Sequence, residues 1–264
     1  MGKVYAIVNQ KGGVGKTTSV INLSAYLASN NRRVLVVDMD PQSNATSGLG
    51  VDKNNVAFST YDLLLGGVQF ADVMINHTEM GIHLLPANPA LSGAEVELVN
   101  ELAREYRLQK ALQPHYDSYD YILIDCPPSL SLLTINALTA ARDGVLIPVQ
   151  CEYLALEGLS QLVQTIELVK RYLNPTLEIR GLVMTMYDSR TNLSRQVVEE
   201  VRRFFPGRVF RTIIPRNIRL SEAPSFGQPI NLYAPSSSGA VAYQVLTTEL
   251  LKGDGFPIKR TPAG

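Results

Sequence analysis

The fold is decided by the stretch Gln10-Lys11-Gly12-Gly13-Val14-Gly15-Lys16-Thr17-Thr18, which separates two different periodicities. A short apolar run at residues 3–9 precedes it and predicts a β-strand. Apolar side chains recur at helical spacing behind it and predict a helix over residues 17–29. A glycine loop that joins a strand to a helix and ends in Gly-Lys-Thr is typical of a phosphate-binding loop.

The residue types of this loop suit an anion. Its glycines let backbone N–H groups turn toward a phosphate, and the N-terminus of the following helix adds partial positive charge. We expect Lys16 to reach the β- and γ-phosphates of a nucleotide, and the Thr17 hydroxyl to bind Mg²⁺. The nucleotide-binding residues expected in the loop are Lys11, Gly12, Gly13, Val14, Gly15, Lys16, Thr17 and Thr18.

The loop departs from the usual pattern at one end. The motif G-x-x-x-x-G-K-[ST] requires glycine where this chain has Gln10, and a second lysine, Lys11, stands five residues before Lys16. A loop lysine that does not bind its own nucleotide is available to a second one. This variant is the deviant Walker A loop, and with it the chain resembles the deviant Walker ATPases.

Length and composition favour one large domain. The 264 residues, 45% of them apolar, fit a single P-loop ATPase domain over residues 1–252, and we expect the glycine- and proline-containing residues 253–264 to be a disordered tail. Cys126 and Cys151 are too few for a disulfide framework and lack metal-ligand spacing, which indicates a reducing cytoplasm. No apolar run approaches the roughly 20 residues of a membrane span, so we expect no membrane partner.

The charges are unevenly distributed, although the formal net charge is zero. Residues 190–219 contain eight arginines and only two acidic residues, Glu199 and Glu200, which gives this segment a net charge of +6. A solvated helix face is one explanation, and a polyanionic partner is the other. The arginines are Arg190, Arg195, Arg202, Arg203, Arg208, Arg211, Arg216 and Arg219.

Apolar runs alternate with helical patterns along the whole chain. This alternation predicts an α/β fold with a mostly parallel, twisted sheet and helices on both faces. Ligands of such sheets bind beyond the carboxyl ends of the strands. We expect further strands at 33–38, 81–86, 119–125, 144–149, 180–186 and 208–214, and further helices at 91–111, 131–141, 155–173, 192–205 and 239–252.

Carboxylates follow two of these strands. Asp125 ends an apolar run and has the position of a Walker B residue, which holds Mg²⁺ directly or through its water. Asp38 and Asp40 end another run, and we expect only one of the two to face a nucleotide. A carboxylate there could position the water that attacks the γ-phosphate, or it could cap a turn before Pro41.

Five further motifs extend the resemblance over nearly the whole chain, from about residue 3 to residue 252. Together they are similar to the ParA/Soj family of chromosome- and plasmid-partition ATPases. Ser43 departs from the family pattern, in which glycine is more usual. The motifs are VDMDPQSNAT at 37–46, IDCPPSL at 124–130, PVQCEYLALEGL at 148–159, YDSRTNLS at 187–194 and IPRNIRLSEAPS at 214–225.

The resemblance implies an ATP- and Mg²⁺-dependent switch in which ATP joins two subunits face to face. Lys11 would then reach the partner's phosphates, a role that an arginine finger has elsewhere. By resemblance Asp40 orients the attacking water, Thr17 ligates Mg²⁺, and Asp125 supports the metal. The catalytic residues are thus Lys11, Lys16 and Asp40, and the resemblance brings Pro215 and Asn217 near the adenine.

The resemblance also gives the arginine-rich segment a partner. The ATP-bound homodimer of this family binds double-stranded DNA without sequence preference, and the matching positions are Arg190 and Arg219. Arginine contacts to phosphates are salt-dependent, and two patches side by side let dimerisation control binding. The implied activity is weak ATP hydrolysis, stimulated by DNA and by a ParB-type centromere-binding protein, in the cytoplasm and on the nucleoid in the ATP state.

Three other classes share parts of this pattern. A MinD-like division-site ATPase would need a basic amphipathic helix at its C-terminus, where this chain has Gly253, Gly255 and two prolines. An electron carrier like the nitrogenase iron protein would need two cysteines that hold a cluster between subunits. An ATP-dependent ligase or synthetase would need a second substrate pocket.

Overall fold

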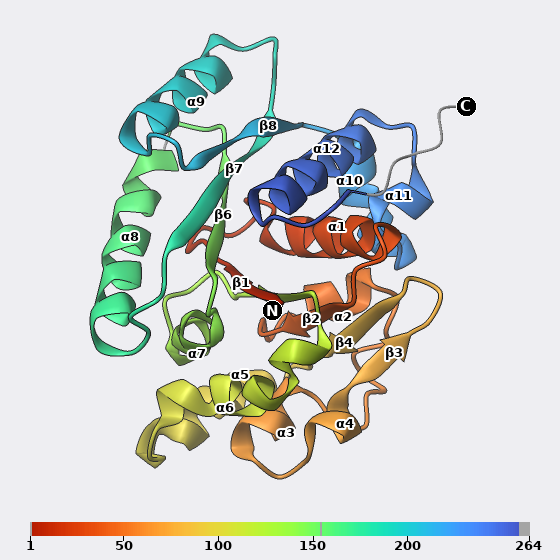
Figure 1. Cartoon of the computed structure of the whole chain (residues 1–264), viewed down its shortest axis with the longest axis vertical. Coiled ribbons are helices and arrows are strands. Elements are labelled where there is room, and N and C mark those ends of the chain that lie inside the picture. Colours follow the sequence, from red (N-terminus) through yellow and green to blue (C-terminus); the bar gives the residue numbers. More distant parts are fainter. Residues whose placement is uncertain (1, 154, 259–264) are drawn as a thin grey trace.

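A sheet of eight strands forms the centre of the computed structural model, which describes residues 2–153 and 155–258 (Figure 1). Its order is β3-β4-β2-β5-β1-β6-β7-β8, and all neighbours are parallel except β3 and β4. The predicted mostly parallel sheet is confirmed. The strands are β1 (Lys3–Ile7), β2 (Val34–Asp38), β3 (Ile75–His77), β4 (Ile82–Leu85), β5 (Tyr121–Asp125), β6 (Gly144–Gln150), β7 (Ile179–Tyr187) and β8 (Val209–Pro215).

Helices cover both faces of the sheet, with α1 and α12 side by side on one face and α7 and α8 on the other (Figure 1). The described helices are α1 (Lys16–Ser29), α2 (Asn44–Gly48), α3 (Thr60–Leu65), α4 (Phe70–Val73), α5 (Leu91–Glu97), α6 (Arg107–Leu112), α7 (Leu132–Ala140), α8 (Ala155–Tyr172), α9 (Asn192–Phe204), α10 (Ile218–Glu222), α11 (Ile230–Tyr233) and α12 (Ser238–Gly253).

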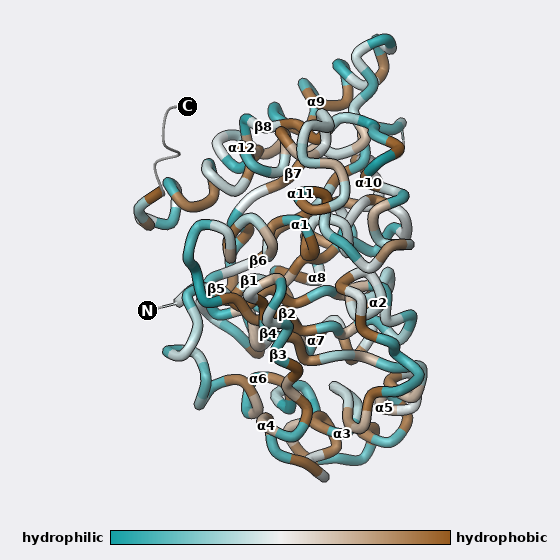
Figure 2. Tube along the Cα trace, turned by 90° about the vertical axis from the view of Figure 1, so that its right-hand side faces the viewer, coloured by the Kyte–Doolittle hydropathy of each residue, from teal (hydrophilic) through white to brown (hydrophobic). Residues whose placement is uncertain are grey.

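Two apolar cores lie on opposite faces of the sheet. In β1, Val4 and Ala6 pack into one core, whereas Tyr5 and Ile7 pack into the other with residues of α1 and α12. Alternate residues of a strand point to opposite faces, so a strand covered on both sides is apolar throughout. Figure 2 shows this distribution: hydrophobic stretches follow the central strands, and hydrophilic ones predominate in the outer loops.

Several regions differ from the sequence predictions. The single helix expected over 91–111 is broken into α5, a 3-10 turn, a second turn and α6, and between the two turns Glu101 is extended and Ala103 is left-handed with φ of 53°. Its periodic apolar residues Val96, Val99 and Leu102 are exposed. The antiparallel edge strand β3 has three residues, too few to produce a recognisable pattern.

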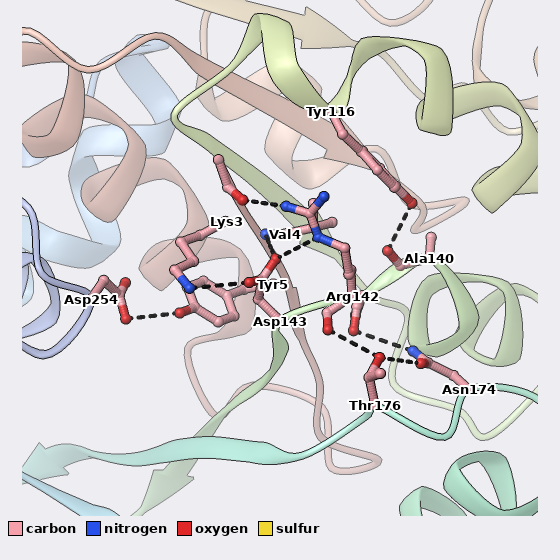
Figure 3. Close-up of polar contacts among 12 residues, drawn as sticks. Lys3, Val4, Tyr5, Tyr116, Ala140, Arg142, Asp143, Asn174, Thr176 and Asp254 are labelled. Carbon is pink, nitrogen blue, oxygen red and sulfur yellow. Dashed lines mark hydrogen bonds and ion pairs between the residues drawn. The ribbon is translucent and has the colours of Figure 1, made fainter.

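Polar contacts hold the amino edge of the sheet together (Figure 3). Asp143 accepts hydrogen bonds from the Val4 amide and from Arg142, and its other oxygen lies 3.2 Å from Lys3 Nζ. Asp254 accepts a hydrogen bond of 2.9 Å from the Tyr5 hydroxyl.

The disordered tail expected from residue 253 onward is wrong for residues 253–258. Gly253 ends α12, and the Asp254 side chain is only 2% exposed. That carboxylate accepts hydrogen bonds of 2.9 Å from the hydroxyls of Tyr5 and Tyr121 and from Arg180 Nε. Composition could not reveal these long-range partners. Residues 259–264 lie outside the described residues.

Candidate nucleotide site and arginine surface

The glycine loop lies between β1 and α1, as predicted, and two of its glycines are required by the backbone. Gly13 and Gly15 have φ of 74° and 92°, a left-handed conformation that side chains disfavour. Gly15 is the last residue before α1, which begins at Lys16. The loop is fixed from the side by Thr185, whose hydroxyl donates to the Val14 carbonyl at 2.8 Å.

Lys16 is buried at the centre of this loop. Its Nζ donates to the Lys11 carbonyl at 3.1 Å. Burial lowers the pKa of Lys16 from its usual value, and the nearby Asp125 carboxylate opposes that shift. A buried ammonium with one backbone acceptor has two further N–H donors to offer an anion.

Asp125 and Thr17 meet at the carboxyl end of β5. The Thr17 hydroxyl donates to Asp125 Oδ2 at 2.7 Å. The other carboxylate oxygen, Oδ1, is buried without a hydrogen-bond partner among the described residues. Burial and the neighbouring Asp38 carboxylate raise the pKa of Asp125 well above its ordinary value. A buried, unpartnered carboxylate oxygen beside a hydroxyl fits a Mg²⁺ site, because Mg²⁺ takes one or two protein oxygens together with waters and phosphates.

The two carboxylates at the carboxyl end of β2, Asp38 and Asp40, have different hydrogen-bond partners. Asp38 is fully buried, and its Oδ2 accepts hydrogen bonds from the Thr46 amide and hydroxyl at 2.8 and 2.7 Å. Burial raises the pKa of Asp38, although these hydrogen bonds oppose the shift. Asp40 makes one short-range contact, in which its Oδ1 accepts from the Gln42 amide at 2.9 Å. Asp38 therefore organises the loop, whereas the Asp40 carboxylate, which is also buried, accepts only this one hydrogen bond among the described residues.

Ser43 adopts a left-handed conformation with φ of 57° directly before α2. Glycine takes this conformation without strain. The departure noted at Ser43 thus falls on a position where the backbone itself favours glycine.

Lys11 forms an ion pair with a residue outside its own loop. Its Nζ lies 3.0 Å from Oε2 of Glu152, which follows β6. The Lys11 amide donates to Asn9 Oδ1 at 3.0 Å, and Asn9 Nδ2 donates to the Pro148 carbonyl at 2.8 Å. Glu152 was missed as a site residue, although it lies within the motif quoted at 148–159.

A cavity of about 140 Å³ adjoins the glycine loop. Its lining includes Gly15 and Thr18 as well as Pro215 and Asn217. The two adenine-site candidates therefore lie beside the phosphate-binding loop. Sequence reasoning missed Met186, which lines the same cavity in a left-handed conformation with φ of 52°, a feature that the sequence does not signal.

The eight arginines of residues 190–219 do not form one patch. Arg190 and Arg219 follow β7 and β8 at the carboxyl edge of the sheet, because Tyr187 and Pro215 are paired at the ends of these strands. Arg208 precedes β8 at the opposite end and lies 3.6 Å from Glu178. The charge excess of the segment is thus divided in space.

The fold and the site define a P-loop nucleotide-binding protein of the deviant Walker class. A family model described as an AAA domain matches residues 2–179. The chain is 57% identical to the chromosome partitioning protein ParA of Myxococcus xanthus (strain DK1622), over 96% of this chain and 89% of the relative. It is 56% identical to the sporulation initiation inhibitor protein Soj of Bacillus subtilis (strain 168), over 95% and 98%. The chain therefore belongs to the ParA/Soj family of partition ATPases.

A solved structure agrees with the fold over nearly the full length. It is described as cobyrinic acid a,c-diamide synthase from Mycobacterium smegmatis with bound ATP analog and magnesium. The TM-score is 0.85 and the identity 39%, over 98% of this chain and 100% of that one.

Three observations bear on the alternative classes. Cys126 and Cys151 are both buried, and burial raises the pKa of both thiols. Within residues 2–153 and 155–258, no three His, Cys, Asp or Glu side chains are grouped as metal ligands. In the same part of the chain, every helix is too short or too polar to cross a membrane.

Proposed function

We propose that this chain is an ATP-dependent switch that dimerises with ATP, binds DNA in that state, and segregates a chromosome or plasmid. The observation that carries the proposal is the presence of two loop lysines in different surroundings: Lys16 is buried in the loop, and Lys11 contacts Glu152 outside it. Family membership supports it, since the two relatives compared are named for chromosome partitioning and sporulation control.

ATP would bind along the loop and into the adjoining cavity. Backbone N–H groups of Gly12, Gly13, Val14 and Gly15 would face the phosphates, and Lys16 would offer its two remaining donors. Thr18, Pro215 and Asn217 would contact the rest of the nucleotide. Mg²⁺ would be held by Thr17 and Asp125, and when bound it would neutralise the charge that develops on the phosphates.

Hydrolysis would depend on two of the chain's own side chains. Asp40 would accept a hydrogen bond from the attacking water and orient it, because its carboxylate is engaged by only one amide contact. Lys11 would leave Glu152 and place its charge on the phosphates of the partner subunit. ATP hydrolysis by the protein alone would be slow, because a second subunit must supply Lys11.

DNA would bind at the carboxyl edge of β7 and β8 through Arg190 and Arg219, whose side chains are 84% and 59% exposed. Such contacts read phosphates and carry no sequence information. One protomer offers few of them, so a dimer with two patches would bind far more tightly. A ParB-type centromere-binding protein would stimulate hydrolysis and release the dimer from the nucleoid into the cytoplasm.

The test is duplex DNA binding measured with ATP, with ADP and without nucleotide. Binding only with ATP supports the switch. Arg190→Ala and Arg219→Ala should each flatten the dependence of log affinity on log salt by about 0.9 per lost phosphate contact, and ATP affinity should not change. Equal binding with ATP and ADP would contradict the proposal.

A second candidate is an ATP-dependent amide synthase, which the description of the Mycobacterium smegmatis structure favours. The two relatives with higher identity carry partition and sporulation names instead. A synthase should consume ATP in proportion to a carboxylic acid and an ammonia donor, whereas the proposed switch should respond to DNA. Comparing ATP consumption under these two conditions separates the candidates.

A further inference from the structure

Each arginine of the proposed DNA surface is held by a carboxylate of its own chain. Arg190 Nε lies 2.9 Å from Asp188 Oδ1, and its Nη2 lies 2.7 Å from Oδ2. Arg219 Nη1 lies 2.8 Å from Glu222 Oε2. The two-point contact of Arg190 occupies the same fork of donors that fits a phosphate. A DNA phosphate must therefore share that fork or displace the carboxylate.

Backbone hydrogen bonds at residues 188 and 190 hold Asp188 in position. Its Oδ1 also accepts the Arg190 amide at 3.0 Å, and the Asp188 amide donates to Ser194 Oγ at 3.3 Å. The hydrogen bonds from Arg190, assisted by the charge of Arg216, hold the pKa of Asp188 below its usual range. The competing charge is therefore present throughout the physiological pH range.

Glu222 is fixed in a similar way. Its Oε2 accepts a hydrogen bond from the Tyr233 hydroxyl at 3.1 Å in addition to the contact with Arg219. Each arginine and its carboxylate together carry no net charge. One protomer consequently attracts a phosphate backbone less than its arginines alone would.

We propose that Asp188 and Glu222 compete with DNA phosphates for Arg190 and Arg219, and so keep the DNA affinity of one protomer low. This inference rests on the proposed function, in which DNA binding must wait for the ATP-bound dimer. Dimerisation controls binding only where one patch alone is too weak to bind. The two carboxylates lower the DNA affinity of one protomer, and they leave in place the arginines with which the dimer would bind DNA.

The test is Asp188→Asn, because asparagine keeps an Oδ1 that accepts the Arg190 amide and loses only the charge. Its matched control is Asp117→Asn, which removes an exposed carboxylate just before β5, at the opposite edge of the sheet. Both are compared with the wild type by fluorescence anisotropy of a labelled duplex in ADP. Asp188→Asn should bind about threefold to fivefold more tightly, the range expected for an exposed charge pair, and Asp117→Asn should not.

Two results would overturn the inference. The first is a gain for Asp188→Asn no larger than that for Asp117→Asn. The second is a gain that survives in the double variant Asp188→Asn/Arg190→Ala, since Asp188 would then act by repelling DNA and not through Arg190. The proposed function fails differently, when wild-type protein binds DNA equally with ATP and ADP.

Discussion

Lys11 Nζ lies 3.0 Å from Oε2 of Glu152 in the same protomer, and the two side chains are 40% and 42% exposed. Ion pairs with this exposure contribute only about 0–1 kcal/mol. The lysine is therefore held by a contact that a stronger anion can replace. The phosphates of a second subunit's nucleotide would be such an anion in the proposed dimer.

Replacing Lys11 by alanine should separate ATP binding from dimerisation. The variant should bind ATP as a monomer, and its hydrolysis rate should fall by about 10³-fold or more, as for loss of an arginine finger. Light scattering with ATP and a steady-state ATPase assay measure the two effects. Glu152→Gln is the control, and it should dimerise with ATP at least as well as the wild type. Dimers formed by Lys11→Ala alone would contradict a role between subunits.

Replacing Lys16 by alanine should strongly weaken ATP binding. Its buried ammonium would be the main side-chain charge on the phosphates, and a hydrogen bond to a charged group contributes about 1.5–3 kcal/mol, or roughly 10- to 150-fold in affinity. Isothermal titration calorimetry with ATP and Mg²⁺ gives the comparison. Lys110→Ala, an exposed lysine of α6, makes the same charge change away from the loop. Unchanged ATP affinity in Lys16→Ala would contradict the assignment of this loop as the nucleotide site.

Asp40→Ala should bind ATP normally and hydrolyse it at least about 100-fold more slowly, because general-base or water-orienting groups contribute about 10²–10⁴. The ATP-bound dimer should then accumulate and elute early in size-exclusion chromatography. Asp38→Ala should behave differently, since it leaves the Thr46 amide and hydroxyl without their acceptor. It should lower the free energy of unfolding by about 1–3 kcal/mol. Continued turnover by a monomeric Asp40→Ala protein would point to another group.

Both cysteines should resist alkylation in the folded protein. Burial raises the pKa of Cys151 to about 12, so that at pH 8 only roughly one thiol in ten thousand would be the reactive thiolate. Iodoacetamide labelling followed by mass spectrometry should therefore modify neither Cys126 nor Cys151 until urea unfolds the chain. Rapid labelling of the native protein would reopen the possibility of a cluster shared between subunits.

Asp254→Ala should destabilise the fold by about 3–5 kcal/mol, because it leaves the Arg180 guanidinium and two tyrosine hydroxyls without their buried acceptor. Urea unfolding followed by circular dichroism measures this loss. Asp254→Asn keeps an oxygen acceptor and should lose less. A loss below about 1 kcal/mol would mean that the buried contacts contribute little to stability.

The phosphate-binding loop and the parallel strands could be predicted because their signals are local. Gly13 and Gly15 occupy backbone conformations that select glycine, and the strands are apolar on both faces because helices cover both. Alternation along a strand could not separate Asp38 from Asp40, because positions i and i+2 lie on the same face. The separation depends on Thr46, eight residues away from Asp38.

What escaped prediction depends on partners distant in the sequence. Glu152 reaches Lys11 across 141 positions, and Asp254 reaches Tyr5 across 249. The charge count over residues 190–219 treated its arginines as one group, whereas β8 carries them to opposite ends of the sheet. Glu101 and Ala103 interrupt the expected helix through non-helical backbone conformations that neither propensity nor periodicity signals.

The buried Asp254 also decides where a reporter can be attached. Because it fastens residues 253–258 to the amino ends of β1 and β5, a fluorescent protein fused behind them would start on the side of the sheet opposite the glycine loop. Live imaging with such a fusion should leave the loop and the arginines of the other edge uncovered. A fusion placed directly before Lys3 would start at the same edge.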